Sequence, residues 1–176
     1  SYPHQHSLAQ EIIAGTRASP GRADLRRRAC TVKALLQRVS RASVTVSSQC
    51  VGEIEQGLLV LLGLDRGDDR TVADRMVDKL LAYRLFADRQ GRMNCSVVDV
   101  HGGVLLVSQF TLSADTRQGL RPSFSSAMPP GEAAQLYDYF LSRLQHCHPQ
   151  VASGVFGADM QVSLVNEGPV TFLLEV

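Results

Sequence analysis

The stretch LLVLLGL, residues 58–64, decides the fold that this sequence predicts. It is apolar on both faces and of strand length, which indicates a β-strand buried on both sides of a sheet. Asp68 or Asp69 can then cap a helix that runs to about Phe86, because apolar residues recur at helical spacing between them. A second buried strand is predicted over 104–110. A strand, a helix and a second strand in this order predict an α/β domain.

The segments on either side extend this pattern. Residues 33–46 alternate between apolar and polar side chains, as expected of a half-buried strand, and a further short strand separates them from the buried one. A second amphipathic helix is predicted over 128–144. Two alternating strands, 160–164 and 170–176, close the chain. The predicted order is ββ(βα)(βα)βββ, with a mixed sheet.

The composition is that of a soluble globular protein, with 44% hydrophobic and 20% charged residues among 176. No run approaches the ~20 apolar residues that a membrane helix requires, so no membrane partner is predicted. The cysteines at 30, 50, 95 and 147 lack the paired spacing of a zinc site or a disulfide framework. We therefore expect free, mostly buried thiols in a reducing cytoplasm, and neither a metal nor a cofactor.

Residues 1–31 differ from the rest and are interpreted as an extension to a domain that spans 32–176. They hold five arginines against Glu11 and Asp24, with no sustained apolar periodicity. This composition is similar to that of an organellar transit peptide. A disordered extension, or upstream sequence read through from a start at Val32, explains it equally well, and no function is assigned to it. The predicted domain carries thirteen Lys and Arg against fifteen Asp and Glu.

Two polar segments interrupt the apolar pattern and are the candidates for chemistry. SQFTLSADTRQGLRPSF, residues 108–124, begins at the carboxyl end of a buried strand, where α/β sheets present ligands. NEGPVT, residues 166–171, places a Gly-Pro dipeptide between two strands. Taken singly, the first is compatible with an edge strand whose hydroxyls face water, and the second with a plain hairpin turn.

In this order and spacing the two segments resemble the D-aminoacyl-tRNA deacylase family, and VKALLQRVSRASVTV (32–46) and GRMNCSV (91–97) resemble it as well. The resemblance covers essentially all of 32–176 and none of 1–31. It implies a three-layer α/β/β domain, a homodimer in the cytoplasm, and hydrolysis of the ester bond of D-aminoacyl-tRNA without a cofactor. It also implies that glycine mischarged on the alanine tRNA is released.

Hydrolysis of such an ester does not demand a covalent nucleophile, because positioning and donors aimed at the developing oxyanion suffice. A Ser/His/Asp triad would require a histidine beside the nucleophile. The predicted domain offers only His101, His146 and His148. We expect His101 to be a turn residue and the other two to form a solvated helix end, so neither a triad nor a metal site is predicted.

The resemblance also assigns roles to individual residues. Gly168-Pro169 resembles the family's Gly-cis-Pro motif, which enters the partner subunit's pocket. There its two carbonyls would exclude the side chain of an L-amino acid. Arg38 would hold that loop. The other expected site residues are Ser108, Gln109 and Thr111 as the catalytic group, Phe110 beside them, Phe124 near the adenine or the scissile ester, and Met93 and Asn94 at the rim. Thr111 is expected to orient substrate or water, and a nucleophilic threonine is the alternative.

Three competing functions stay open. A relative with relaxed chirality would clear L-alanine or glycine, but the intact SQFTL and NEGPVT strings favour the D-specific reading. A non-enzymatic nucleic-acid-binding dimer is disfavoured by the acidic balance of residues 32–176, since broad nucleic-acid binding relies on basic surfaces. A dimeric pseudoenzyme is the third alternative.

Overall fold

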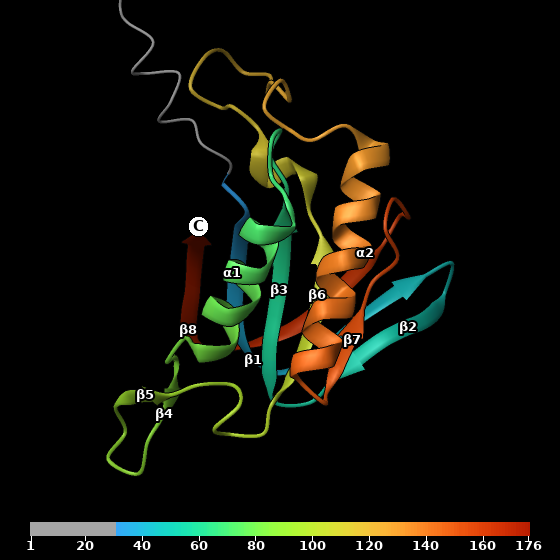
Figure 1. The fold of residues 1–176 in the computed structure, drawn as a ribbon. Coiled ribbons are helices and arrows are strands. Elements are labelled where there is room, and N and C mark those ends of the chain that lie inside the picture. The colour runs from blue at the N-terminus through green and yellow to red at the C-terminus, as the bar shows by residue number, and fades with distance from the viewer. Residues whose placement is uncertain (1–30) are drawn as a thin grey trace, which may run out of the picture.

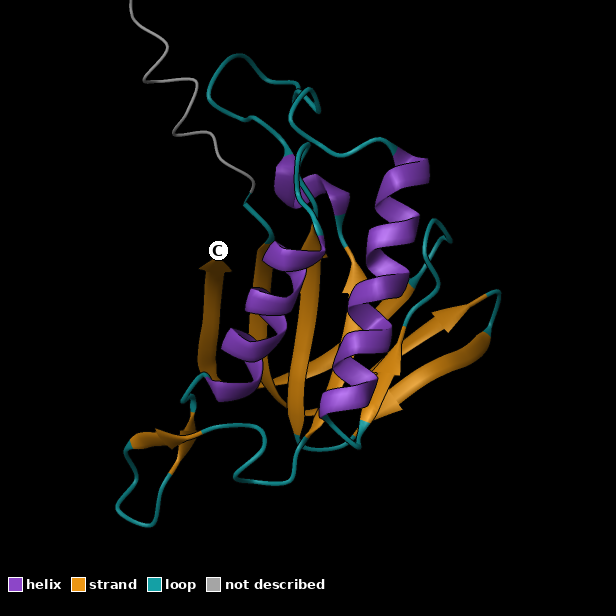
Figure 2. Cartoon of the chain, in the orientation of Figure 1, coloured by secondary structure: helices purple, strands orange, loops and turns teal. Residues whose placement is uncertain are grey.

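The computed structural model describes residues 31–176, so the expectation for the segment 1–31 lies outside the described residues except at Thr31. A six-stranded sheet carries two helices on one face (Figures 1 and 2). The elements are, in chain order, β1 (Lys33–Val46), β2 (Gln49–Ile54), β3 (Gly57–Gly63), α1 (Arg70–Ala82), β4 (Phe86–Ala87), β5 (Met93–Cys95), β6 (Gly103–Ser108), the 3-10 helix η1 (Phe110–Ser113), α2 (Pro130–Cys147), β7 (Val151–Ser153) and β8 (Gln161–Glu175).

The sheet is mixed, as predicted. Its order is β2-β1-β3-β6-β7, and β8 pairs with β1. The pairs β3–β6 and β6–β7 are parallel, because α1 and α2 carry the chain from the end of one strand to the start of the next. The pairs of β1 with β2, β3 and β8 are antiparallel. The parallel strands β3 and β6 therefore end at the same edge of the sheet.

One core lies between the sheet and the two helices. Asp69 caps α1 by accepting a hydrogen bond from Val72 N at 2.9 Å, as the sequence predicted. Alternate residues of the buried strands, among them Leu58 and Leu106, pack against the apolar faces of the helices. Phe140 of α2 is fully buried in this core.

A second core lies on the opposite face of the sheet. β1 continues past the end of its pairing with β3, and its second half pairs with β2 and with the first half of β8. Val39 and Val44 of β1 pack there against Leu59 of β3 and Leu105 of β6. Helices, central sheet and this second group of strands make three layers, which confirms the predicted α/β/β arrangement.

The C-terminal strands differ from the prediction. Two strands follow α2 rather than three, and the two expected around the Gly-Pro dipeptide are one strand, β8. Asn166 pairs with Val39 and Thr171 with Gln37, so residues 167–170 bulge out opposite the single residue Arg38. The pairing with β1 resumes beyond the bulge, which is why the dipeptide interrupts the strand without ending it.

Smaller differences follow from local packing. β6 ends at Ser108, so Phe110 begins η1 instead of closing a strand. The helix α1 ends at Ala82, four residues before the predicted end, because the chain becomes extended at Tyr83. The segment 87–92 is a turn as predicted, and Gly91 takes a positive φ of 77° there. That turn connects β4 to β5.

The cysteine and histidine predictions were partly wrong. The cysteines at 50, 95 and 147 are free, but Cys50 and Cys147 are exposed rather than buried. His148 does not belong to a solvated helix end. It is 3% exposed, and its Nε2 lies 2.7 Å from the carbonyl oxygen of Gly102. His101 is a turn residue with a φ of 52°, as predicted.

Across residues 31–176, no helix has the length and apolar character needed to cross a bilayer. Within the same part of the chain, no group of three or more His, Cys, Asp or Glu side chains is arranged to hold a metal ion.

Candidate functional site

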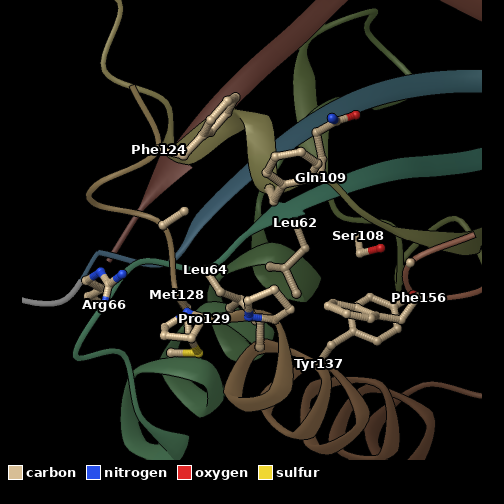
Figure 3. A pocket seen from close by; sticks show the side chains of 15 residues that line it. Leu62, Leu64, Arg66, Ser108, Gln109, Phe124, Met128, Pro129, Tyr137 and Phe156 are labelled. Atoms are coloured by element: carbon tan, nitrogen blue, oxygen red, sulfur yellow. The ribbon is translucent and has the colours of Figure 1, made fainter. Parts of the chain in front are cut away.

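An apolar pocket of about 440 Å³ opens at the carboxyl ends of β3 and β6 (Figure 3). Its floor is formed by Leu62 and Leu64, which are 2% and 6% exposed. The start of α2 closes one side with Pro130 and Tyr137, and Phe156 from the loop after β7 closes another. The pocket lies where parallel strands of an α/β sheet usually present a ligand.

Four of the predicted site residues line this pocket: Ser108, Gln109, Phe110 and Phe124. Ser108 is in register with Leu62 of the neighbouring strand, and Gln109 N donates to the carbonyl oxygen of Leu62 at 2.7 Å. That hydrogen bond ends the strand, and η1 then turns the chain across the pocket mouth. Ser108 and Gln109 therefore form the polar wall of this pocket.

Thr111 does not line the pocket. It lies in η1 and is exposed, and Gln109 Nε2 donates to its Oγ1. The hydroxyl is thus connected to the pocket through a side chain that does line it.

Two aromatic rings stand at the mouth of the pocket. Phe110 is 62% exposed and Phe124 is 39% exposed, and their ring centroids lie 5.2 Å apart at an interplanar angle of 50°. Such exposure of two neighbouring phenyl rings is costly in water, so it points to a flat apolar ligand that covers them. A nucleobase has the required shape.

The pocket contains very little that can exchange a proton near neutral pH. Among the described residues, no histidine, cysteine or carboxylate lines it, and Arg66 is its one charged side chain. Tyr137 donates its hydroxyl hydrogen to the carbonyl oxygen of Leu106 at 3.1 Å, and burial raises the pKa of this phenol above its ordinary value. What the pocket can supply is shape, exclusion of water and a few oriented donors.

The Gly-Pro segment forms a second cluster. The Gly168-Pro169 peptide bond is cis, as expected, and both residues are exposed. Asn166 braces the turn, because its Nδ2 donates to the carbonyl oxygen of Val170 at 3.0 Å and its Oδ1 accepts from Val170 N at 3.2 Å. A Cβ on residue 168 would lie 2.0 Å from Val170 N, so only glycine fits there.

Arg38 fastens this turn to the body of the protein. Its Nε donates to the carbonyl oxygen of Glu167 and its Nη1 to that of Leu85, both at 2.8 Å. These contacts agree with the expectation that Arg38 holds the loop. Met93 and Asn94 lie in β5 of the small hairpin that follows Leu85, and neither lines the pocket.

The two clusters lie at opposite ends of the same strand. Arg38 pairs with Leu58 at the start of β3, whereas Leu62, four residues later, borders the pocket. At about 3.3 Å per residue, at least ~13 Å of strand separates them. Figure 1 shows the same separation, with the β4–β5 hairpin at one end of the sheet and the loop that precedes α2 at the other. Within this chain, therefore, the turn and the pocket do not meet.

Sequence reasoning missed several residues of the pocket. Met128, Pro129 and Tyr137 fall within the helix predicted over 128–144 and were not recognised as site residues, and neither were Arg66 and Phe156. Arg66 and Phe156 belong to loops that no pattern connects to the 108–124 segment. The apolar Met-Pro-Pro run, residues 128–130 at the start of α2, was the one available signal.

Comparison with known proteins agrees with the resemblance noted in the sequence. A family model described as D-Tyr-tRNA(Tyr) deacylase matches residues 35–175. A D-aminoacyl-tRNA deacylase of Cellvibrio japonicus (strain Ueda107) is 64% identical over 142 residues, which cover 81% of this chain and 97% of that protein. A D-aminoacyl-tRNA deacylase of Stutzerimonas stutzeri (strain A1501) is 62% identical over 144 residues, which cover 82% and 99%.

Two solved structures share the fold. One, named "c-Myc DNA Unwinding Element Binding Protein", has a TM-score of 0.79 and 41% identity, and the match covers 82% of this chain and 98% of that one. The other is described as "a probable eukaryotic D-amino acid tRNA deacylase" and has a TM-score of 0.72 at 19% identity, covering 83% and 100%. At that identity the second supports the fold alone.

Proposed function

This chain belongs to the D-Tyr-tRNA(Tyr) deacylase family and hydrolyses the ester of D-aminoacyl-tRNA, and we propose that cleavage takes place in the pocket at the ends of β3 and β6. The observation that carries this proposal is the lining of that pocket. Ser108 and Gln109 offer polar groups at one wall of an otherwise apolar space, beside two exposed phenyl rings.

The substrate occupies the pocket in two parts. The adenine covers Phe110 and Phe124, and the ester lies deeper, against Ser108 and Gln109. With no histidine or carboxylate in the described lining, attack comes from water or from the neighbouring ribose hydroxyl. Donors at the strand end stabilise the oxyanion that forms. Gln109, held by its bond to Thr111, orients the ester for this attack.

Chirality is selected by the Gly168-Pro169 turn of a second subunit. The turn is exposed, braced by Asn166 and Arg38, and lies at the far end of β3 from its own pocket. Only a partner can bring it to the ester. Carbonyl oxygens set against the α-carbon would leave room for a hydrogen and reject a side chain, which is discrimination by clash. Glycine has no side chain to reject, so glycyl-tRNA should also be a substrate.

The dimer that this requires has a suitable apolar surface on the face of the sheet opposite the helices. Leu35 is paired with Leu61 on one side and with Leu173 on the other, so the three leucines form a row across β3, β1 and β8. Leu173 is 51% exposed. A two-fold axis through this row would pack it against itself, as an isologous interface requires. Met93 and Asn94 of one subunit would then approach the rim of the other subunit's pocket.

One experiment tests the proposed function directly. The purified chain is given D-tyrosyl-tRNA and L-tyrosyl-tRNA in parallel, and the rate of tyrosine release is compared with the uncatalysed rate. We expect rapid hydrolysis of the D-ester and rates near background for the L-ester. Equal rates on both would refute chirality selection, and no hydrolysis of either would refute the assignment of catalysis to this pocket.

A further inference from the structure

A second cavity, of about 530 Å³, adjoins the apolar pocket and is polar. Arg66 borders both cavities, and the segment 124–127 forms their common wall. Phe124 and Ala127 of that segment line the apolar pocket, whereas Ser125 and Ser126 line the polar one. A ligand seated in the first cavity can therefore extend into the second past Arg66, which Figure 3 shows at the side of the pocket away from Ser108 and Phe156.

The charges in this polar cavity leave one cation in excess. Lys33 Nζ lies 2.6 Å from Asp65 Oδ2, and Arg117 Nη2 lies 2.6 Å from Asp115 Oδ2, so these two cations are paired. Arg66 forms no ion pair with any carboxylate of residues 31–176. The cavity consequently carries a net positive charge, and the excess lies at the boundary with the apolar pocket.

The position of the Arg66 guanidinium is fixed by the wall that it shares. Its Nε donates to the carbonyl oxygen of Ser125, and its backbone N donates to that of Ser126, both at 2.9 Å. A guanidinium has five N–H donors, so the bond to Ser125 leaves its two terminal nitrogens for a ligand. The hydroxyl groups of Ser125 and Thr116 line the same cavity and add neutral donors, whereas the Ser113 hydroxyl donates to the carbonyl oxygen of Leu64.

We propose that the polar cavity binds the phosphodiester backbone at the 3′ end of the tRNA, with Arg66 as the contact nearest the ester. The inference rests on the proposed function and extends it. In an aminoacyl-tRNA the ribose that carries the ester also carries, at its 5′ carbon, the last phosphodiester of the chain. A pocket that holds this ribose must therefore place a phosphate within a few bonds, and a guanidinium recognises phosphate by two parallel hydrogen bonds.

The net charge of the domain makes a local contact of this kind necessary. Residues 32–176 carry more acidic than basic side chains, so the domain has no general attraction for RNA. Recognition of the acceptor end must come from a few arginines close to the ester. Arg66 meets this requirement, and Arg117, held by Asp115 at the other side of the cavity, can contact the next phosphate.

The test compares two D-tyrosyl esters of adenosine, of which only one carries the phosphodiester chain of the tRNA. One is D-tyrosyl-tRNA, and the other is adenosine esterified with D-tyrosine at its 2′ or 3′ hydroxyl. We expect Arg66→Gln to raise KM for the tRNA roughly tenfold, as for loss of one charge-assisted hydrogen bond, with little change in kcat. The same variant should change KM for the adenosine ester far less than KM for the tRNA, because that ester carries no phosphate. Arg66→Lys, which keeps the charge, should restore part of the affinity for tRNA.

The salt dependence gives a second readout. In a plot of log(kcat/KM) for the tRNA against the logarithm of the salt concentration, loss of one phosphate contact should make the slope less steep by about 0.7, the value per phosphate for single strands. Arg75→Gln, which removes an exposed charge on α1 that lines neither cavity, is the matched control and should change neither the KM for either ester nor the salt slope.

Either of two other results for Arg66→Gln would overturn the inference. If Arg66→Gln raises KM equally for both esters, the arginine serves the apolar pocket and not a phosphate. If it changes neither ester, the polar cavity does not bind the RNA backbone. In both cases hydrolysis of D-esters by the wild type leaves the proposed function intact. If the wild type hydrolyses neither ester, both the inference and the proposed function are refuted.

Discussion

Arg38 Nε donates a hydrogen bond of 2.8 Å to the carbonyl oxygen of Glu167, a residue 129 positions later in the chain. The second donor, Nη1, reaches Leu85 O at the same distance. One side chain thus joins the Gly-Pro bulge of β8 to the segment between α1 and β4. The orientation of the exposed turn depends on this guanidinium more than on any apolar packing, because residues 167–169 are exposed.

The first prediction is that Arg38→Ala weakens chirality selection while the fold is retained. The turn would lose its tether and sample other orientations, so its carbonyls would no longer face the α-carbon reliably. We expect the ratio of D- to L-tyrosyl-tRNA hydrolysis to fall by about tenfold or more, equivalent to ~1.4 kcal/mol. Arg41→Ala, at an exposed position of the same strand, is the control and should leave the ratio unchanged. An unchanged ratio in Arg38→Ala would show that the turn does not read chirality.

The second prediction concerns the dimer. Leu173→Glu places a charge in the row of Leu61, Leu35 and Leu173, and burial of an unpaired carboxylate at an interface is strongly unfavourable. We expect sedimentation to report a monomer, and activity on D-tyrosyl-tRNA to fall sharply with it. Because Leu173 is 51% exposed in the single chain, the variant should still fold. Val51→Glu, on the exposed β2, should remain dimeric. A fully active Leu173→Glu monomer would exclude completion of the site by a partner.

Much of the fold could be predicted from the sequence, because the decisive signals are local. The apolar run of β3, the helical spacing that follows Asp69 and the alternation of β1 each identify an element from neighbouring residues alone. The long β8 could not be predicted in this way. Its continuity across the Gly-Pro dipeptide depends on pairing with β1 on both sides of Arg38, which is a contact between distant segments.

The candidate site likewise contains residues that local sequence could predict and residues that it could not. Ser108 and Gln109 were recognisable because a buried strand ends there in polar residues, and Phe110 and Phe124 because they lie in the same motif. Arg66 and Phe156 enter the pocket from separate loops, and their positions are set by tertiary packing alone. The prediction that His148 lies at a solvated helix end was wrong for a related reason. Its neighbours in sequence are exposed, but Gly102 O supplies a partner within the core.

The third prediction separates positioning from covalent catalysis at Thr111. The hydroxyl accepts from Gln109 and is not in the pocket lining, so Thr111→Ala removes one bond that orients Gln109. We expect kcat to fall about tenfold and to stay well above the uncatalysed rate. Mass spectrometry of a quenched wild-type reaction should detect no acyl group on Thr111. A trapped acyl-threonine, together with complete loss of activity in the variant, would establish a nucleophile instead.

The fourth prediction concerns the pH dependence of stability. Asp68 is 8% exposed, and its Oδ1 and that of Asp65 have no hydrogen-bond partner among residues 31–176. Burial, followed by the nearby Asp65 carboxylate, raises the pKa of Asp68 from 3.8 to about 6. The folded state therefore binds the proton more tightly than the unfolded state. The stability that this gives is fully present below pH ~4 and is lost as the pH rises through about 6.

Asp68→Asn should remove this loss, because the amide is neutral throughout and its oxygen can still accept from Asp65 N. A pKa raised by about two units corresponds to at most ~3 kcal/mol. Between pH 4 and pH 7 the wild type should therefore lose up to that amount of its free energy of unfolding through Asp68, and the variant should not. Urea unfolding at both pH values measures the difference. Asp159→Asn, at an exposed loop position, is the comparison. Parallel pH profiles of wild type and Asp68→Asn would contradict the raised pKa.

The last prediction concerns the two phenyl rings at the pocket mouth. Phe124 lies 5.2 Å from Phe110, ring centroid to ring centroid, and 39% of it is exposed although it belongs to the wall of an apolar pocket. If the terminal adenine stacks there, Phe124→Leu keeps an apolar side chain of similar volume and loses only the aromatic face. Stacking of a base on an aromatic ring contributes about 1–3 kcal/mol, so KM for D-tyrosyl-tRNA should rise roughly tenfold. The ratio of D- to L-ester hydrolysis should not change, because the Gly-Pro turn and not the ring selects chirality. Leu120→Ala, in the same loop but fully exposed, provides the control and should behave like the wild type. A variant in which KM is unaltered while kcat and chirality selection both fall would place Phe124 at the scissile ester and the adenine elsewhere in the pocket.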